Sequence, residues 1–178
     1  MNIAITHYWD GQPCLDMTRH ASVELAFSET GALRITAQAQ AHTYLPATPP
    51  LSRSWGLWEY DVVECFLLGE QEYLEIELSA EGHYLVLRFD APRHCIDRYE
   101  EYQFAIQKLP APEGFWRTQI EIPATLLPRG LKTLNGYAIS GPAEDRHYLS
   151  ATALPGEKPD FHQPQRFVLS SLTFEHSR

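Results

Sequence analysis

The sequence predicts an all-β protein, an antiparallel β-sandwich of the jelly-roll or immunoglobulin-like kind with roughly ten or eleven short strands. Hydrophobic and polar side chains alternate with a period of two through much of the chain. Turn signals that contain Gly or Pro separate these stretches at hairpin spacing. The segment 123–128, Pro-Ala-Thr-Leu-Leu-Pro, has room for at most one short helical turn.

One domain covering residues 1–178 is the simplest organisation for a chain of this length. The 13 prolines are spread along the chain, and the sequence contains no internal repeat or interdomain linker. The formal net charge is −9 and no basic cluster is present, so we expect no nucleic-acid partner.

The first part of the chain predicts a short strand followed by a hairpin. Residues 2–8 favour the short strand. Residues 22–28 and 33–40 alternate hydrophobic and polar side chains, and the Glu-Thr-Gly between them turns the chain. Residues 46–53 contain three prolines and predict a loop.

The stretch 55–90 contains three further predicted strands. Residues 62–68 are largely apolar on both parities, which predicts a central strand covered on both faces. Residues 73–78 and 84–89 alternate and predict a half-buried hairpin. Glu64 is the exception in the first of these strands. An ionised carboxylate there needs hydrogen-bond or charge partners, or its pKa rises until it is neutral.

Two expectations about side-chain direction follow from these strands. If the chain is extended from Trp58 onward, Trp58 and Glu64 share one face, and an indole stands beside a hydrogen-bond acceptor. Glu75 and Glu77 alternate with apolar residues and are expected on a solvated strand face. Either of them could also pair with Glu64 for glycoside hydrolysis, although the sequence fixes no separation between the carboxylates.

The second half of the chain predicts strands separated by an irregular region and by turns. The irregular region is 92–98, and a Pro- and Gly-containing turn follows the first strand after it. The expected strands are 100–109, 116–122, 134–140, 146–154 and 167–174.

The cysteines and the N-terminus indicate the compartment. Cys14, Cys65 and Cys95 are widely spaced, and no Cys-x-x-Cys or His/Cys cluster predicts a zinc site. The N-terminus has neither the basic nor the apolar region of a signal peptide, and no apolar run approaches transmembrane length. We therefore expect a cytoplasmic protein without a membrane partner.

Three segments, in this order and spacing, carry a resemblance to a known superfamily. They are GLWEYDVVECFL…YLEIELSAEGHY (56–84), FWRTQIEIPATLL (115–127) and KPDFHQPQRFVLSSL (158–172). Together they resemble the DOMON-like, family 9-type carbohydrate-binding modules, over roughly residues 55–175 of this chain. Each motif alone is weak, and the ordered set is fairly specific.

The resemblance implies an antiparallel β-sandwich in which two aromatic side chains clamp a saccharide and a Glu accepts bonds from its hydroxyls. Trp58 and Glu64 stand at the positions of the first motif, and Phe161 stands at the second aromatic position. That position is usually Trp in the sugar-binding members. The secreted modules also carry signal peptides and are usually attached to glycoside hydrolases, so this chain is more similar to the stand-alone bacterial members.

The aromatic residues have a structural alternative. Trp55 and Trp58 could close one end of the sandwich, and Phe161 could pack under a loop.

The acidic residues also have structural alternatives. Glu64 could accept backbone N–H bonds or pair with an arginine such as Arg88 or Arg98. Asp61 could contribute to a calcium site, since calcium occurs as a structural ion in the superfamily. A cap on the preceding turn is the favoured role for Asp61, because no close set of oxygen ligands accompanies it in the sequence.

His162 lies beside the expected aromatic site and could donate to a ligand or bind metal. The alternative is a turn residue with one hydrogen bond. We expect no cofactor. Other DOMON-like proteins carry haem, commonly with a Met axial ligand, but Met1 and Met17 lie outside the matching region, which leaves only bis-His ligation open.

The sequence thus favours non-catalytic binding of a saccharide or similar polyhydroxy small ligand at Trp58, Glu64 and Phe161, with Trp55 and His162 nearby. An alternative from another class is a small hydrolase or lyase that uses Glu64 and His162 as acid and base. No GxSxG, HExxH, P-loop or GxGxxG motif supports catalysis. A third alternative is an interaction module whose exposed aromatic side chains contact another protein.

Overall fold

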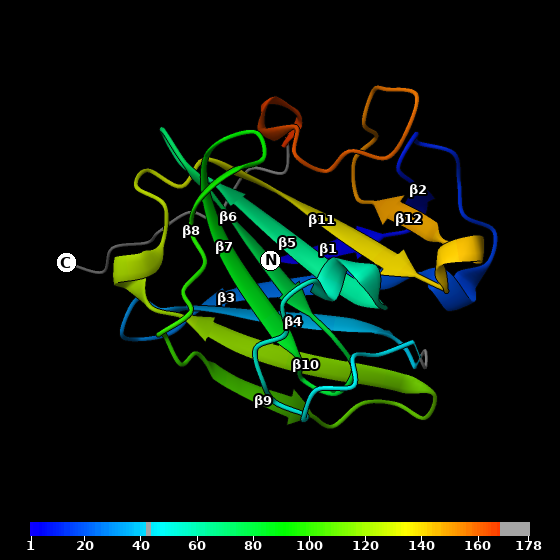
Figure 1. Ribbon diagram of the computed structural model, residues 1–178, viewed down its shortest axis with the longest axis horizontal. Coiled ribbons are helices and arrows are strands. Elements are labelled where there is room, and N and C mark those ends of the chain that lie inside the picture. The colour runs from blue at the N-terminus through cyan, green and yellow to red at the C-terminus, as the bar shows by residue number, and fades with distance from the viewer. Residues whose placement is uncertain (42–43, 168–178) are drawn as a thin grey trace.

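The computed structural model describes residues 1–41 and 44–167, and these residues form two antiparallel β-sheets (Figure 1). The predicted all-β sandwich is confirmed. The described residues contain twelve strands, one or two more than predicted. The strands are β1 (Asn2–Ile5), β2 (His7–Tyr8), β3 (Ala21–Phe27), β4 (Leu33–Gln40), β5 (Val62–Leu68), β6 (Tyr73–Leu78), β7 (Tyr84–Ala91), β8 (His94–Asp97), β9 (Ala105–Leu109), β10 (Phe115–Ile122), β11 (Thr133–Ser140) and β12 (His147–Ser150).

Short 3-10 helices connect several strands. The helical turn expected within residues 123–128 is confirmed as η3 (Ala124–Leu126). Four further 3-10 turns occur among the described residues: η1 (Met17–Arg19), η2 (Leu57–Glu59), η4 (Ala143–Asp145) and η5 (Pro164–Arg166). The other four escape prediction because a three-residue 3-10 helix is too short to show a hydrophobic period.

The two sheets differ in size. The smaller sheet has the order β1-β3-β4-β10-β9, and the larger sheet has the order β2-β12-β11-β5-β6-β7-β8. We call the face of the larger sheet that points away from the smaller sheet its outer face. The strands β5, β6 and β7 occupy the middle of the larger sheet, and every feature of the candidate site depends on them.

The two predicted hairpins are confirmed. Strands β3 and β4 pair with Val23 opposite Ala37, and strands β6 and β7 pair with Ile76 opposite Val86. Strand β5, predicted as a central strand, lies between β6 and β11.

Other strand bounds differ from those predicted. The single strand expected at 2–8 is two strands, because β1 pairs with β3 in the smaller sheet whereas β2 pairs with β12 in the larger sheet. The region 92–98, expected to be irregular, contains β8, which pairs with β7 through two register shifts. These shifts break the period of two, and β8 therefore gives no strand pattern in the sequence.

Two expected strands are shorter than predicted. Only 105–109 of the segment 100–109 and only 147–150 of the segment 146–154 are strand. The strand expected at 167–174 lies outside the described residues, apart from Phe167, which follows η5.

The first hydrophobic core lies between the two sheets. Strand β5 contributes Val63, Cys65 and Leu67 to it, and strands β6 and β7 contribute Leu74, Ile76, Leu78, Tyr84 and Val86. The smaller sheet contributes residues such as Val23 and Ile35. This packing uses one parity of each strand, as the period of two requires.

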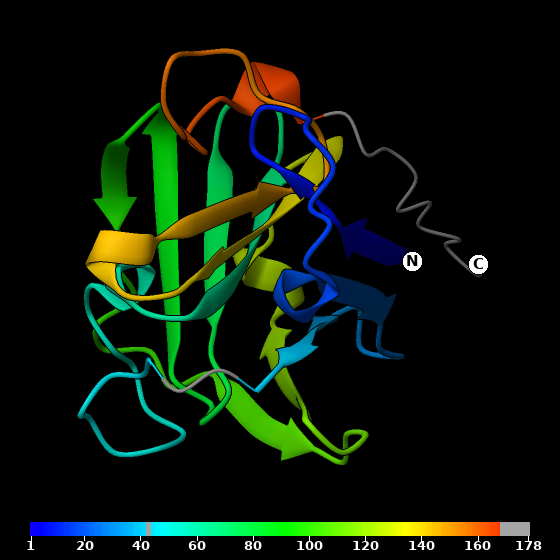
Figure 2. The same ribbon diagram turned by 90° about the vertical axis from the view of Figure 1, so that its right-hand side faces the viewer.

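A second hydrophobic cluster covers the outer face of the larger sheet. It combines Phe66 and Leu87 of the central strands with residues from the segment 154–167, which we call the covering segment. Figures 1 and 2 show this segment, coloured orange to red, at one end of the larger sheet. The prediction that 73–78 is half-buried is therefore wrong, since all six of its residues are buried.

None of the helices among the described residues combines the length and the apolar character needed to cross a bilayer.

Replacing Ile76 with Ala tests the core between the sheets. Ile76 is fully buried, so we expect Ile76→Ala to lower the free energy of unfolding by about 2–5 kcal/mol. Ile96→Ala is the matched control, because Ile96 is 48% exposed on β8, and we expect a change within about 0.5 kcal/mol. Urea denaturation followed by circular dichroism measures both changes, and equal changes would contradict the assigned core.

Candidate functional site

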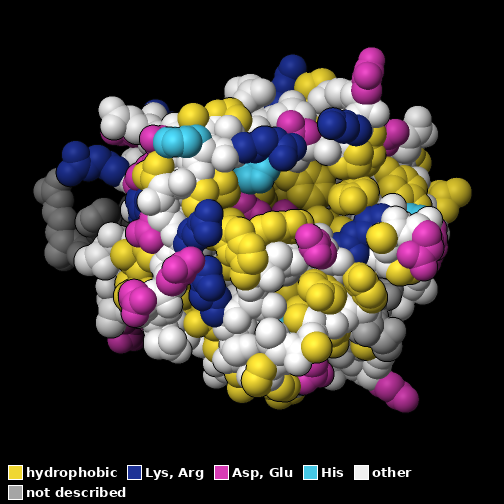
Figure 3. All heavy atoms as spheres, in the orientation of Figure 1, with side chains coloured by type: hydrophobic (Ala, Val, Ile, Leu, Met, Phe, Trp, Pro, Cys, Tyr) yellow, Lys and Arg dark blue, Asp and Glu magenta, His cyan; other side chains and the backbone are white. Residues whose placement is uncertain are grey.

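The outer face of the larger sheet contains a cavity of about 370 Å³. Figure 3 shows a hollow on this side of the molecule, with hydrophobic side chains around it and acidic side chains at its bottom. The aromatic residues that line the cavity are Trp55, Trp58, Phe66, Phe89, Tyr148 and Phe161. The titratable residues that line it are Glu64, Glu75, Arg93, Cys95, Asp160 and His162.

The five residues that the sequence offers as ligand contacts all line this cavity. They are Trp55, Trp58, Glu64, Phe161 and His162. The expected reason for the proximity of Trp58 and Glu64 is nevertheless wrong. The chain is not extended from Trp58 onward, because Trp58 lies in η2 and the strand begins only at Val62.

Two indoles form one wall of the cavity. The rings of Trp55 and Trp58 lie 5.1 Å apart between centroids, edge to face at 82°. Gly56 between them has a φ of 76°, in the left-handed region that glycine adopts without strain, and it begins η2. The guanidinium carbon of Arg98 lies 4.5 Å from the centre of the Trp55 ring. Trp55 stays half exposed.

Phe161 forms part of the wall that the covering segment provides. Its ring stacks on Tyr137 at 4.1 Å between centroids and 9° between planes, and it is buried. The hydroxyl of Tyr137 donates to the carbonyl oxygen of Phe161. One face of the Phe161 ring is thus occupied by Tyr137, the ring of Tyr148 packs edge to face against it, and Phe161 lines the cavity with the surface that is left.

Three glutamates lie together on the outer face, and we call them the carboxylate cluster. Glu64 on β5 stands directly opposite Glu77 on β6, and Glu75 is two residues before Glu77 on the same strand. One carboxylate oxygen of each glutamate lies within 4.8 Å of those of the other two, and all three residues are buried. The expectation that Glu75 and Glu77 lie on a solvated face is wrong, because the outer face is covered.

The carboxylate cluster has no ion pair with Lys or Arg among the described residues. Neither arginine suggested as a partner of Glu64 contacts it. Arg88 donates to Glu72, and Arg98 lies over Trp55. Arg146, which does act on Glu64 electrostatically, donates its hydrogen bonds to backbone carbonyl oxygens of residues 58, 60 and 141.

Burial raises the pKa of each carboxyl in the cluster, and repulsion between the charges adds to the shift at Glu64 and Glu77. Burial is the main cause in all three cases and raises the pKa of Glu75 to about 7. The Glu75 charge raises the pKa values of Glu64 and Glu77 further, and Arg146 opposes the shift at Glu64. At Glu75 a hydrogen bond with Glu77 opposes the shift, and the Arg93 charge does so to a smaller extent. Like charges directly opposite one another on neighbouring strands destabilise a sheet. The cluster therefore favours its protonated forms.

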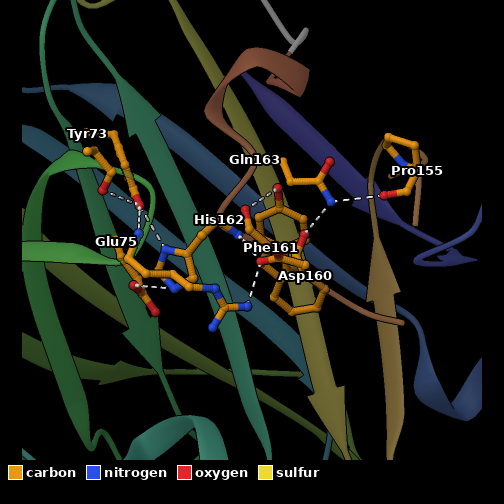
Figure 4. Close-up of polar contacts among 10 residues, drawn as sticks. Tyr73, Glu75, Pro155, Asp160, Phe161, His162 and Gln163 are labelled. Carbon is orange, nitrogen blue, oxygen red and sulfur yellow. Dashed lines mark hydrogen bonds and ion pairs between the residues drawn. The ribbon is translucent and has the colours of Figure 1, made fainter. Parts of the chain in front are cut away.

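His162 lies between Glu75 and Phe161 in the close-up of the site (Figure 4). Its Nδ1 shares a hydrogen bond of 2.8 Å with the Tyr73 hydroxyl, and its Nε2 lies 3.8 Å from Oε2 of Glu75. Its ring centroid lies 5.5 Å from that of Phe66 and 4.9 Å from that of Phe89. Burial lowers the pKa of His162 to about 4, and the imidazole is neutral near pH 7.

An ion pair stands at the edge of the cavity. Arg93 donates to Oδ1 of Asp160 over 2.8 Å, and the backbone N–H of His162 donates to the same oxygen. Arg93 has a φ of 63°, and its backbone N–H donates to the Tyr73 hydroxyl. These bonds connect the covering segment to the turn between β7 and β8.

Asp61 lies outside the cavity lining and outside the carboxylate cluster. Its Oδ2 accepts the backbone N–H of Tyr44 over 2.9 Å, and its Oδ1 accepts that of Gly141 over 2.7 Å. Asp61 thus joins two loops that are distant in the chain, and the expected cap on the preceding turn is wrong, because both carboxylate oxygens accept N–H groups of these loops. A calcium role for Asp61 stays a prediction.

The sequence contained a pattern from which the position of Glu75 and Glu77 beside Glu64 could have been predicted. Tyr73, Glu75 and Glu77 share one parity of β6, and a hairpin between β5 and β6 places that parity beside Glu64. Arg93 and Asp160 gave no comparable signal, because their meeting depends on a contact between segments 67 residues apart in the chain.

Fold and site together define a class: an antiparallel β-sandwich with a small-molecule-sized aromatic cavity above a buried carboxylate cluster. The sequence is 31% identical to the zebrafish (Danio rerio) UPF0462 protein C4orf33 homolog, over 98% of this chain and 92% of that protein. It is 28% identical to the human UPF0462 protein C4orf33, over 91% of this chain and 83% of that protein, and 30% identical to the mouse homolog, over 94% and 89%. The chain belongs to the UPF0462 family.

A solved structure shares the fold. It is a "putative carbohydrate-binding protein" from Bacteroides uniformis, with a TM-score of 0.69 and 18% identity over 96% of this chain and 85% of that one. No family model matches the sequence. The relation to DOMON-like, family 9-type modules and a bacterial source both stay predictions.

Glu75→Gln tests the pKa of the carboxylate cluster. Because the pKa of Glu75 is raised from 4.5 to about 7, its ionisation lowers the stability of the folded state as the pH rises from 4.5 to 7. The neutral amide removes this cost. We expect Glu75→Gln to match the wild type at pH 4 and to exceed its free energy of unfolding by about 3 kcal/mol at pH 8 in EDTA.

Urea denaturation across this pH range measures the Glu75 effect. Glu113→Gln, in the exposed loop before β10, is the control and should follow the wild type within about 0.5 kcal/mol. A Glu75→Gln profile parallel to that of the wild type would disprove the raised pKa.

Asp61→Ala tests the role of Asp61 as a link between two loops. Loss of two hydrogen bonds from backbone N–H groups to a buried carboxylate should lower the free energy of unfolding by about 3–5 kcal/mol. The loss should be the same with EDTA and with added calcium. A calcium-dependent loss in thermal denaturation would instead assign Asp61 to a calcium site.

Proposed function

We propose that this protein binds a saccharide or a similar polyhydroxy small molecule in the cavity, without catalysing a reaction on it. The observation that carries the proposal is the placement of the two indoles and the carboxylate cluster around one cavity. The proposal includes the sequence-based expectations of one domain, a cytoplasmic location and no nucleic-acid partner.

The walls of the cavity suit the apolar faces of a sugar ring. The C–H faces of a pyranose pack on aromatic rings, and indoles offer the largest such surface. Trp58 and the half-exposed Trp55 supply this aromatic surface, and Phe161 also lines the cavity. A volume of about 370 Å³ is within the range of small-molecule sites.

The bottom of the cavity suits hydroxyl groups. A hydroxyl both donates and accepts hydrogen bonds, and a protonated carboxyl does the same. Glu64 and Glu75 line the cavity and have raised pKa values, so at neutral pH they can present both kinds of group. The Arg93–Asp160 pair at the edge adds a charged donor and a charged acceptor.

Two further findings support the proposal. The Bacteroides uniformis protein that shares the fold bears the name "putative carbohydrate-binding protein". The motif around Trp58 and Glu64 resembles that of the sugar-binding modules. Both findings concern other proteins, and the binding experiment below tests this chain directly.

In a catalytic alternative, the structure favours Glu75 over Glu64 as the carboxylate that acts with His162. The sequence pairs Glu64 with His162 as acid and base, whereas the carboxylate that contacts His162 in the structure is Glu75, at 3.8 Å. The neutral imidazole and the raised carboxyl pKa values are features that cluster at catalytic sites. A hydrolase or lyase of this kind predicts turnover that Glu75→Gln or Glu64→Gln abolishes.

A glycan array followed by calorimetric titration tests the proposal. We expect at least one saccharide to bind, and Trp58→Ala to weaken its binding at least about tenfold, equivalent to about 1.4 kcal/mol. Phe115→Ala is the control, because Phe115 is an exposed aromatic residue of the smaller sheet, and it should bind like the wild type.

The outcomes separate the three functions. Binding without turnover that depends on Trp58 supports the proposal, and turnover lost in Glu75→Gln replaces it with the enzyme. Absence of binding to every saccharide on the array contradicts the proposal, and a protein captured through Trp55 would then favour the interaction module.

A further inference from the structure

We infer that the carboxylate cluster binds a hard divalent cation, of the Ca²⁺ or Mn²⁺ class, at the bottom of the cavity. The inference does not rest on the proposed function, since the cation can bind with or without a saccharide above it. It also differs from the calcium site suggested for Asp61, whose two oxygens already accept backbone N–H groups.

The separation of the ligand atoms carries the first step. One carboxylate oxygen from each of Glu64, Glu75 and Glu77 lies within 4.8 Å of the other two. Ligand oxygens stand about 2.3–2.6 Å from a bound Ca²⁺, so two of them on opposite sides of the ion are about 4.6–5.2 Å apart. The spacing in the cluster is therefore close to that of ligands in a coordination sphere.

Unsatisfied acceptors carry the second step. Both carboxylate oxygens of Glu77 and Oε2 of Glu75 are buried and accept no hydrogen bond from any described group outside the cluster. Glu77 is fully buried, and Glu75 is 4% exposed. Buried polar atoms are almost always partnered, and exceptions call for an explanation such as a bound ion. These buried oxygens belong to the carboxylate cluster, and their position indicates that a positively charged ligand binds there.

The balance of charge carries the third step. The nearest cationic side chains have other partners, because Arg93 pairs with Asp160 and Arg146 donates to backbone carbonyl oxygens. Ionisation of the cluster therefore places up to three negative charges in one buried volume without a Lys or Arg side chain in contact among the described residues. A divalent cation would compensate two of them directly.

The donor set indicates the class of cation. Three carboxylates offer only oxygen ligands, which hard ions such as Ca²⁺, Mg²⁺ and Mn²⁺ prefer. Glu64 and Glu75 line the cavity, whereas Glu77 lies behind them, so the open side of the cluster faces the cavity. Water or ligand hydroxyls can complete the coordination from that side. Nε2 of His162, beside Glu75, is a further donor that would favour Mn²⁺.

Calorimetry on the full chain, freed of metal with a chelator and then titrated with Ca²⁺ or Mn²⁺ alone, tests the inference. We expect one saturable site, with electron paramagnetic resonance showing the loss of free Mn²⁺. Glu77→Gln should weaken binding at least tenfold, and Glu64→Gln should do the same. Both replacements keep the shape of the side chain and remove charge, and circular dichroism checks that the fold is intact.

Two control variants keep the test specific. Glu113→Gln removes an exposed carboxylate from the loop before β10, and Asp61→Asn alters the acidic residue that links two loops. Neither should change cation affinity by more than about twofold. Saturable binding by neither ion, or binding that Glu64→Gln and Glu77→Gln leave unchanged, would overturn the inference. Saccharide titrations in the presence of chelator are scored separately, so failure of one proposal is distinguishable from failure of the other.

Discussion

The structure depends on the requirement that both faces of the strands β5, β6 and β7 be covered. Their apolar side chains point alternately to the two faces, and exposure of either face would leave a large hydrophobic surface in water. The smaller sheet covers one face, and the loop with η2 and the covering segment cover the other. Because loops and turns cover a flat sheet less completely than a second sheet does, the outer face retains a cavity. The candidate site is therefore a result of how the sheet is covered.

The same cover explains why three acidic residues are buried together. A carboxylate on a solvent-exposed sheet face lowers the folding stability little. A carboxylate under a hydrophobic cover loses its hydration and lowers the stability more. The cluster of Glu64, Glu75 and Glu77 thus lowers stability while it concentrates reactive or ligand-binding groups at one place. Such costs are typical of functional sites, where local stability is given up for binding or chemistry. This is the physical reason to look for function on the outer face rather than on the smaller sheet.

Local patterns in the sequence were enough for the fold and only partly enough for the site. Alternation of hydrophobic and polar residues predicted the hairpins of β3 with β4 and β6 with β7, because each depends on neighbours in the chain. The burial of Glu75 could not be predicted in this way, because it depends on the segment 154–167, which lies about 80 residues further along the chain. Trp58 lines the predicted site even though it lies on a 3-10 turn, since the turn and not an extended strand carries it there. The contact between Arg93 and Asp160 needed the fold itself.

The paired indoles have a consequence for spectroscopy. Trp55 and Trp58 lie 5.1 Å apart and nearly perpendicular, a geometry in which the electronic transitions of two chromophores mix. Such mixing produces optical activity whose sign and intensity depend on the angle between the rings. The two indoles therefore form an intrinsic spectroscopic probe beside the cavity. A small rotation of either ring would change the near-ultraviolet circular dichroism without any attached label.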